Sequence, residues 1–156
     1  MAQPRHPIDP QHPVDPDTGP MPRSSAPASG PVVCAVAVGG VIGALARYSA
    51  GRAWHDGAAQ FPWTTLAINV LGGALIGVLM VVVAERGPVH PLWRPLLGTG
   101  VLGGFTTFST YTVDLQRALA HDRWGQAAGY GLLTIAGALA AVFAATFGAR
   151  LVAART

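Results

Sequence analysis

Charge is scarce in this sequence. Only 11% of its 156 residues are charged, and lysine is absent, since all ten basic residues are arginines. Soluble domains carry about 25% charged residues, so this composition, with 51% hydrophobic residues, excludes an ordinary soluble protein. A single cysteine, Cys34, excludes a disulfide framework within the chain. We therefore expect a membrane-embedded protein.

Charged residues are missing altogether from four windows. A membrane-spanning helix needs about 20 mostly apolar residues. Three windows meet or approach that length, and we expect the first, shorter one to extend toward Ala50. The windows are 31–46, 61–84, 95–113 and 124–149. The sequence thus predicts an all-α protein with four transmembrane helices, which form one domain over residues 31–156.

Residues 1–30 differ in kind from the rest of the chain. They contain eight of the 13 prolines, with three aspartates and almost no aromatic or β-branched residues. Such a segment buries too little apolar surface to offset the entropy of ordering it. We predict a disordered tail over 1–30. A signal peptide is not expected, because the short basic region that begins one is missing.

The arginines are divided almost evenly between the two sides of the membrane. With four spans, the tail, the central loop and the C-terminus share one side with six arginines, and four lie on the other. Insertion normally follows a clear excess of positive charge on the cytosolic side. A near tie therefore keeps insertion in both orientations open. The arginines are scattered over helix ends, which favours lipid anchoring over nucleic-acid binding.

Glycines four residues apart recur in every predicted span. This spacing lets helix backbones approach closely in lipid, where packing drives association. The pairs are Gly39 and Gly43, Gly73 and Gly77, Gly100 and Gly104, and Gly125 and Gly129. We expect tight helix packing and an oligomer, most economically a homodimer.

The stretch GGFTTFSTY at 103–111 is unusually polar for an uncharged window, with two glycines and five hydroxyl side chains. In an unbroken helix, such hydroxyls bond back to carbonyls one turn earlier, which accounts for one or two of them. So many favour a helix that is broken in the middle. Carbonyls released at a break make cation sites, and N–H groups and hydroxyls serve anions.

Other polar and aromatic residues leave two interpretations each. Arg47, at the end of the first span, either snorkels to the interface or has a structural role. Asn69 either bonds a neighbouring helix or lines a wet cavity. Phe108 and Tyr111 share a helix face, either as a packing stripe or as rings whose positive edges face an anion.

In the fourth span, Tyr130 and Thr134 share a face and either bond nearby backbone or extend a ladder of donors. Asp114 is expected at the membrane–water interface, at the end of the third span.

No predicted span has an acid near its centre, which argues against the main alternative, a four-helix exporter of cationic drugs. A second alternative, a non-conducting assembly subunit, leaves the polar stretch unexplained. No nucleophile–base set appears, so we expect no enzyme.

Three blocks of the sequence resemble the CrcB or Fluc family of small fluoride channels. They are GGVIGALARY at 39–48, TTLAINVLGG at 64–73 and GVLGGFTTFST at 100–110. The resemblance covers about residues 32–149. It implies a fluoride-selective channel of the plasma membrane that exports fluoride passively. It also implies an antiparallel, dual-topology dimer with two pores at the subunit interface.

The resemblance further implies roles for individual residues. A central structural sodium ion would be held by the backbone carbonyls of Gly103 and Thr106 from each subunit. The first-helix arginine of the family matches Arg47. The family's pore residues fall on Asn69, Phe108, Ser109, Thr110, Tyr111, Tyr130 and Thr134.

Two positions depart from the family pattern. Tyr111 stands where a second phenylalanine is usual, and Asp114 stands where glutamate is usual. The tyrosine keeps a ring edge and adds a hydroxyl that either donates to an anion or obstructs its path. Some members of the family pair two non-identical chains with one degenerate pore. A heterodimer with a second homologous chain therefore stays open beside the homodimer.

Overall fold

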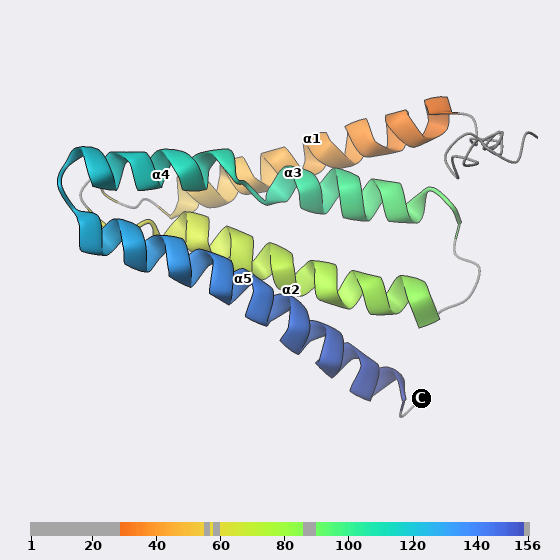
Figure 1. Cartoon of the computed structure of the whole chain (residues 1–156). Coiled ribbons are helices and arrows are strands. Elements are labelled where there is room, and N and C mark those ends of the chain that lie inside the picture. Colours follow the sequence, from red (N-terminus) through yellow and green to blue (C-terminus); the bar gives the residue numbers. More distant parts are fainter. Residues whose placement is uncertain (1–28, 55–56, 58–59, 86–89, 155–156) are drawn as a thin grey trace, which may run out of the picture.

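A computed structural model of the chain describes residues 29–54, 57, 60–85 and 90–154. All regular structure in these ranges is helical and crosses the length of the molecule four times (Figure 1). The third pass is interrupted. The elements are α1 (Ser29–Ala53), α2 (Trp63–Glu85), η2 (Arg94–Leu102), α3 (Gly103–Phe105), α4 (Ser109–Ala120) and α5 (Trp124–Ala153).

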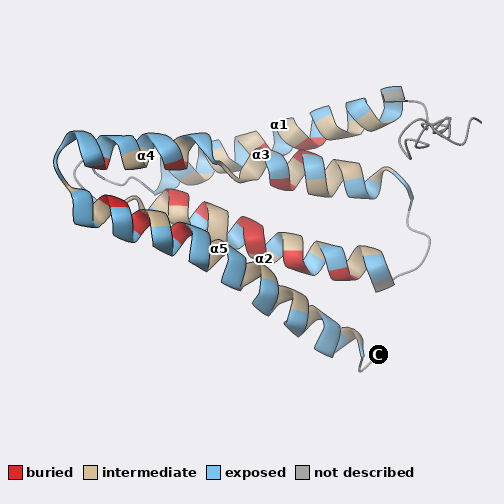
Figure 2. Cartoon of the chain, viewed as in Figure 1, coloured by how far each residue is buried: buried red, intermediate tan, exposed pale blue. Residues whose placement is uncertain are grey.

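Three of the four passes are long and apolar enough to cross a membrane as single helices: Gly30–Ala53, Trp63–Ala84 and Trp124–Ala153. Many of their large apolar side chains are exposed, and Figure 2 shows few buried positions on any helix. Such surfaces suit contact with lipid or with another subunit. The all-helical prediction is confirmed. The predicted tail lies outside the described residues up to 28, and α1 already begins at Ser29.

The four passes alternate in direction. The start of α1, the end of α2 and the end of α5 lie at one end of the molecule, and the end of α1 and the start of α5 lie at the other (Figure 1). At the α4–α5 turn, Asp122 adopts a left-handed conformation with φ of 54°, which aspartate tolerates better than most residues. This arrangement agrees with the alternation that the arginine count assumed.

Two of the predicted glycine pairs pack against each other. α1 lies along η2 and α3, and a Cβ on Gly39 would come within 2.9 Å of the Gly100 Cα. A Cβ on Gly43 would collide with the Val101 carbonyl, and one on Gly104 would lie 3.1 Å from the Gly40 Cα. The absence of side chains therefore permits this close approach.

A third pair joins α2 to α5. Cβ atoms on Gly73 and Gly77 would lie 2.7 Å from the Ala138 carbonyl oxygen and 2.6 Å from that of Val142. Cβ atoms on Gly125 and Gly129 would meet nothing within 4 Å in the described part of the chain. Three of the four glycine pairs thus pack between helices of this chain, and the fourth pair leaves open space on α5.

The first half of the third pass, η2, is a π-helix of nine residues. Such wide helices are rare, and they are frequent at functional sites. Sequence patterns predicted an ordinary helix here. Of the two glycines of η2, Gly100 lies against Gly39 of α1, whereas Gly98 faces the Leu79 side chain of α2. The missing side chain of Gly100 permits the close approach to α1.

Candidate functional site

The third pass breaks where the polar stretch predicted. The helix ends at Phe105, Thr106 is extended with ψ of 157°, and helix resumes at Ser109. The interruption lies about halfway along the pass (Figure 1). The prediction of a third helix broken in the middle is confirmed.

The side chain of Asn69, on α2, forms two hydrogen bonds with the backbone at this break. Its Nδ2 donates to the Thr107 carbonyl and its Oδ1 accepts from the Thr107 N–H, both at 2.9 Å. The amide therefore satisfies both backbone groups of one peptide position that lost its helical partners. The first interpretation of Asn69, bonding to a neighbouring helix, therefore agrees with the structure.

The break releases particular carbonyls by diverting their donors. In a continuous helix the Thr107 N–H would bond the Gly103 carbonyl, but it donates to Asn69 instead. The Thr110 N–H would bond the Thr106 carbonyl, but it donates to the Thr107 hydroxyl at 3.1 Å. Gly103 and Thr106 are thus the two positions whose carbonyls lose their helical donors to side chains.

Arg47 forms a hydrogen bond with another carbonyl near the break, that of Gly104. Its Nε donates to the carbonyl of Gly104 at 3.1 Å. This bond ties the end of α1 to α3 at the level of the break. Arg47 is half-buried, so the structure places it in a contact between helices, and not in a purely interfacial position.

Gly72 makes room for the extended residue of the break. A Cβ on Gly72 would collide with the Thr106 methyl group, Cγ2, and would lie 3.6 Å from the Phe105 ring. The hydroxyl of Thr106 bonds back to the Leu102 carbonyl at 3.0 Å. α2 therefore supports the break twice, through the amide of Asn69 and through the missing side chain of Gly72.

A cavity of about 330 Å³ opens between α2, the break and α5. It brings together four of the predicted pore residues, namely Asn69, Phe108, Tyr111 and Thr134. The remainder of its lining is mostly aliphatic, from α2 and α5. Asn69 therefore bonds the break and also lines this cavity.

Thr134 is the least satisfied polar group of this cavity. Its side chain is buried, and its Oγ1 has no hydrogen-bond partner among the described residues. A buried hydroxyl without a partner costs about 1–3 kcal/mol. A polar ligand or water in the cavity would offset that cost.

The two rings of the polar stretch differ in their surroundings. Phe108 is 78% exposed, whereas Tyr111 is buried, and their ring centroids are 5.6 Å apart. The Tyr111 hydroxyl donates to the Gly131 carbonyl of α5 at 3.4 Å. The added hydroxyl is thus directed to α5, while the Phe108 ring is left largely uncovered by the described part of the chain.

The predicted Tyr130 lies beyond Tyr111 and contacts Asp114. The Tyr130 and Tyr111 ring centroids are 5.4 Å apart, and the Tyr130 hydroxyl donates to Asp114 Oδ2 at 3.4 Å. Thr65 donates to the same oxygen at 2.9 Å. The Asp114 side chain is only 13% exposed, so this residue belongs to the site and is not simply interfacial.

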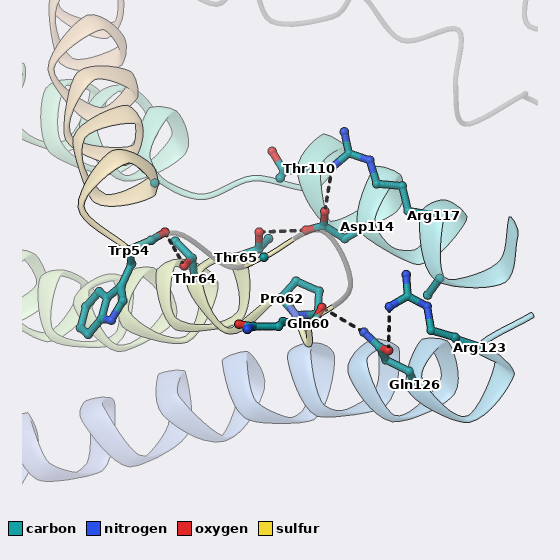
Figure 3. A pocket seen from close by; sticks show the side chains of 13 residues that line it. Trp54, Gln60, Pro62, Thr64, Thr65, Thr110, Asp114, Arg117, Arg123 and Gln126 are labelled. Carbon is teal, nitrogen blue, oxygen red and sulfur yellow. Dashed lines mark hydrogen bonds and ion pairs between the residues drawn. The ribbon is translucent and has the colours of Figure 1, made fainter. Parts of the chain in front are cut away.

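A second pocket, of about 310 Å³, lies beside Asp114 at the end of the bundle. Figure 3 shows Thr65 and Arg117 directed at the carboxylate, with Arg117 Nη1 3.8 Å from Oδ1. Arg123 contacts Gln126 at 3.4 Å at the outer edge of this pocket. The lining of this pocket thus includes the Asp114 carboxylate and the guanidinium groups of Arg117 and Arg123.

Three predicted pore residues do not line the first cavity: Tyr130, described above, and Ser109 and Thr110. Ser109 is exposed, with its hydroxyl 3.3 Å from that of Thr107. Thr110 donates from its backbone and lies in the pocket beside Asp114. Sequence reasoning also gave no role to Thr107, Thr65 or Gly72. The paired threonines were a visible signal for Thr107, but its partners lie on α2, far away in sequence.

Taken together, these features define a small multi-pass membrane protein whose third pass breaks beside a partly polar cavity, the construction of a membrane transport protein.

Comparison with known proteins agrees with this class. The family model described as CrcB-like protein, Camphor Resistance (CrcB), matches residues 34–146. The chain is 52% identical over 122 residues to "Fluoride-specific ion channel FluC 1" of Streptomyces coelicolor, covering 78% of this chain and 79% of that protein.

Two further relatives carry similar names. The chain is 51% identical over 121 residues to "Fluoride-specific ion channel FluC 2" of Thermobifida fusca, covering 75% of this chain and 87% of that protein. It is 43% identical over 131 residues to "Fluoride-specific ion channel FluC 2" of Nocardia farcinica, covering 81% and 94%. This chain belongs to the CrcB family of fluoride channels, a family of transporters and not of enzymes.

Proposed function

We propose that this protein is a fluoride-specific channel of the plasma membrane, which lets fluoride leave the cell passively. The names of its relatives support this function. The observation that carries it on this chain is the cavity where Asn69, Phe108, Tyr111 and Thr134 converge. Family membership sets aside the two alternatives, a drug exporter and a non-conducting subunit.

The chemistry of the cavity suits a small anion that must lose its water. An ion pathway has to replace the hydration shell and still release the ion. The unpartnered Thr134 hydroxyl and the Asn69 amide offer donors, and ring edges at Phe108 and Tyr111 carry partial positive charge. The cavity lining includes no formally charged side chain, so exit remains easy.

We further propose that two subunits assemble antiparallel and that their pores lie at the interface. Phe108 supports this assembly, because a ring that is 78% exposed beside a polar cavity suits contact with a second subunit. The open face at Gly125 and Gly129 leaves more surface for a partner. Ser109 and Thr110 then continue the donor track along α4. The homodimer is the simplest such assembly.

A central sodium ion completes the proposal. Carbonyl oxygens are suitable ligands for it, and the carbonyls of Gly103 and Thr106 are those whose helical donors are diverted to side chains. In an antiparallel dimer the two breaks would meet near the middle of the membrane. The bound cation would also offset the repulsion between anions in the neighbouring pores.

The first experiment measures fluoride efflux from liposomes that contain the purified full-length chain, using a fluoride electrode. We expect rapid fluoride efflux, chloride efflux at least about 100-fold slower, and loss of fluoride efflux in Phe108→Ile, because the ring edge is removed. Phe147→Ile is the matched control, since Phe147 is exposed near the end of α5. Absence of flux from well-folded wild-type protein, alone and with a homologous partner chain, contradicts the proposed function.

A further inference from the structure

Phe61 lies just before α2 and joins the aromatic residues of the site through Tyr130. Its ring meets the Tyr130 ring edge to face, with centroids 5.6 Å apart and planes at 89°. It also lies 4.5 Å from the Trp63 ring. Rings therefore follow one another from Phe108 through Tyr111 and Tyr130 to Phe61.

Phe61 and Tyr111 together confine the Tyr130 ring, which is 1% exposed. The Tyr130 hydroxyl reaches Asp114 at 3.4 Å, which is long for a bond between oxygen atoms. A bond of that length directs the ring only weakly. The hydroxyl also interacts with the Thr65 side chain, and the Phe61 and Tyr111 rings pack against the Tyr130 ring that carries it.

The segment that carries Phe61 is itself tied to α5. The Gln126 side chain donates from Nε2 to the Gln60 carbonyl at 3.2 Å (Figure 3). Pro62 follows Phe61 and restricts its backbone to extended conformations, and the Trp63 N–H closes a short turn onto the Phe61 carbonyl at 2.8 Å. Phe61 thus has a defined position relative to Tyr130.

We propose that Phe61 is a positioning residue of the anion pathway, which holds the Tyr130 ring so that its hydroxyl stays at Asp114. This inference rests on the proposed fluoride channel and adds a residue outside the predicted pore set. Loss of the ring would let Tyr130 tilt into the space left behind, and its hydroxyl would leave the oxygen that Thr65 also contacts.

The test compares fluoride efflux from liposomes for Phe61→Leu, Phe61→Tyr and the control Phe147→Leu. Phe147 is exposed and lies in the last third of α5. We expect Phe61→Leu to slow fluoride efflux about tenfold, in the range of coupling between residues in contact. Phe61→Tyr keeps the ring and should stay within about twofold of wild type. Phe147→Leu should equal wild type.

A second comparison separates positioning from general packing. In a Tyr130→Phe background the hydroxyl is missing, so Phe61→Leu should cause no further loss of flux. An equal fold loss in both backgrounds overturns the proposal, as does an unchanged flux in Phe61→Leu. Phe61→Met replaces Phe61→Leu if that variant is not monodisperse in detergent. If neither folds, Phe61 serves folding and the proposal is overturned. Wild-type protein without flux would contradict the channel itself, a separate outcome.

Discussion

The Asn69 side chain decides which backbone groups the break exposes. By accepting the Thr107 N–H it takes the donor that a continuous helix would give to Gly103. By donating to the Thr107 carbonyl it also fixes the direction of the chain as α4 begins. One amide on α2 thus shapes both the proposed cation site and the cavity beside the break.

Replacement of Asn69 by leucine should therefore affect two properties. We expect the free energy of unfolding to fall by about 2 kcal/mol, because backbone groups of Thr107 lose their partners. The proposed sodium site should weaken as well, since the Thr107 N–H becomes available to the Gly103 carbonyl. The measurement is the melting temperature in detergent, in sodium and in N-methylglucamine buffers.

Wild-type protein should melt higher in sodium than in N-methylglucamine, by preferential binding to the folded state, and Asn69→Leu should show no such difference. Ser109→Ala is the control, because it removes only an exposed hydroxyl contact. An equal sodium effect in Asn69→Leu and wild type would contradict the role given to Asn69.

Helix pairs in this protein are defined by glycine more than by large apolar residues. α1 meets the third pass, and α2 meets α5, at positions where a single Cβ would collide with backbone. Backbone atoms on both sides cannot move aside as a flexible side chain does. Close packing of this kind places α1 near enough for Arg47 to reach Gly104.

Two adjacent glycines of α1 allow a matched test. A Cβ on Gly39 would meet Gly100 at 2.9 Å, and one on Gly40 would meet nothing within 4 Å in the described part of the chain. Gly39→Ala should destabilise the fold by about 1–3 kcal/mol through overpacking. Gly40→Ala should be neutral or stabilise it by about 0.5 kcal/mol, since alanine favours helix. Melting temperatures of the two variants decide the matter, and equal values would contradict this packing.

The chain as a whole leaves much apolar surface uncovered, with a ring at the break directed outward. Both features suit a protein that is completed by lipid and by a second subunit. The near balance of arginines between the two ends supports the proposal that subunits insert in both directions. An antiparallel pair would bring the two breaks to the same depth.

Surface labelling tests this orientation directly. In a Cys34→Ala background, Ala120→Cys marks the end of α4 and Ala154→Cys marks the opposite end of the molecule, both at exposed positions. With insertion in both directions, a membrane-impermeant maleimide should label about half of each variant in intact cells. Labelling of one variant alone would show a single orientation and would contradict the antiparallel dimer.

Much of this fold could be predicted from the sequence, because the features concerned depend on residues that are close together in the chain. Uncharged windows of membrane length predict the passes, and crowding of glycines and hydroxyls at 103–111 predicts the break, because both depend on neighbouring residues. The π-helix of η2 was not predicted, because no local pattern in residues 94–102 distinguishes it from an ordinary helix. Asp114 likewise was expected at the membrane–water interface, whereas its carboxylate accepts hydrogen bonds from Thr65 and Tyr130.

The sequence by itself determined that this is a four-pass membrane protein with a broken third pass, and its motifs indicated the family. Tertiary structure decided which atoms the break presents. Asn69 meets Thr107 across 38 positions, and Arg47 meets Gly104 across 57. Such pairs form only when packed helices bring distant segments together, so no local pattern specifies which carbonyls lose their donors or which ring confines Tyr130.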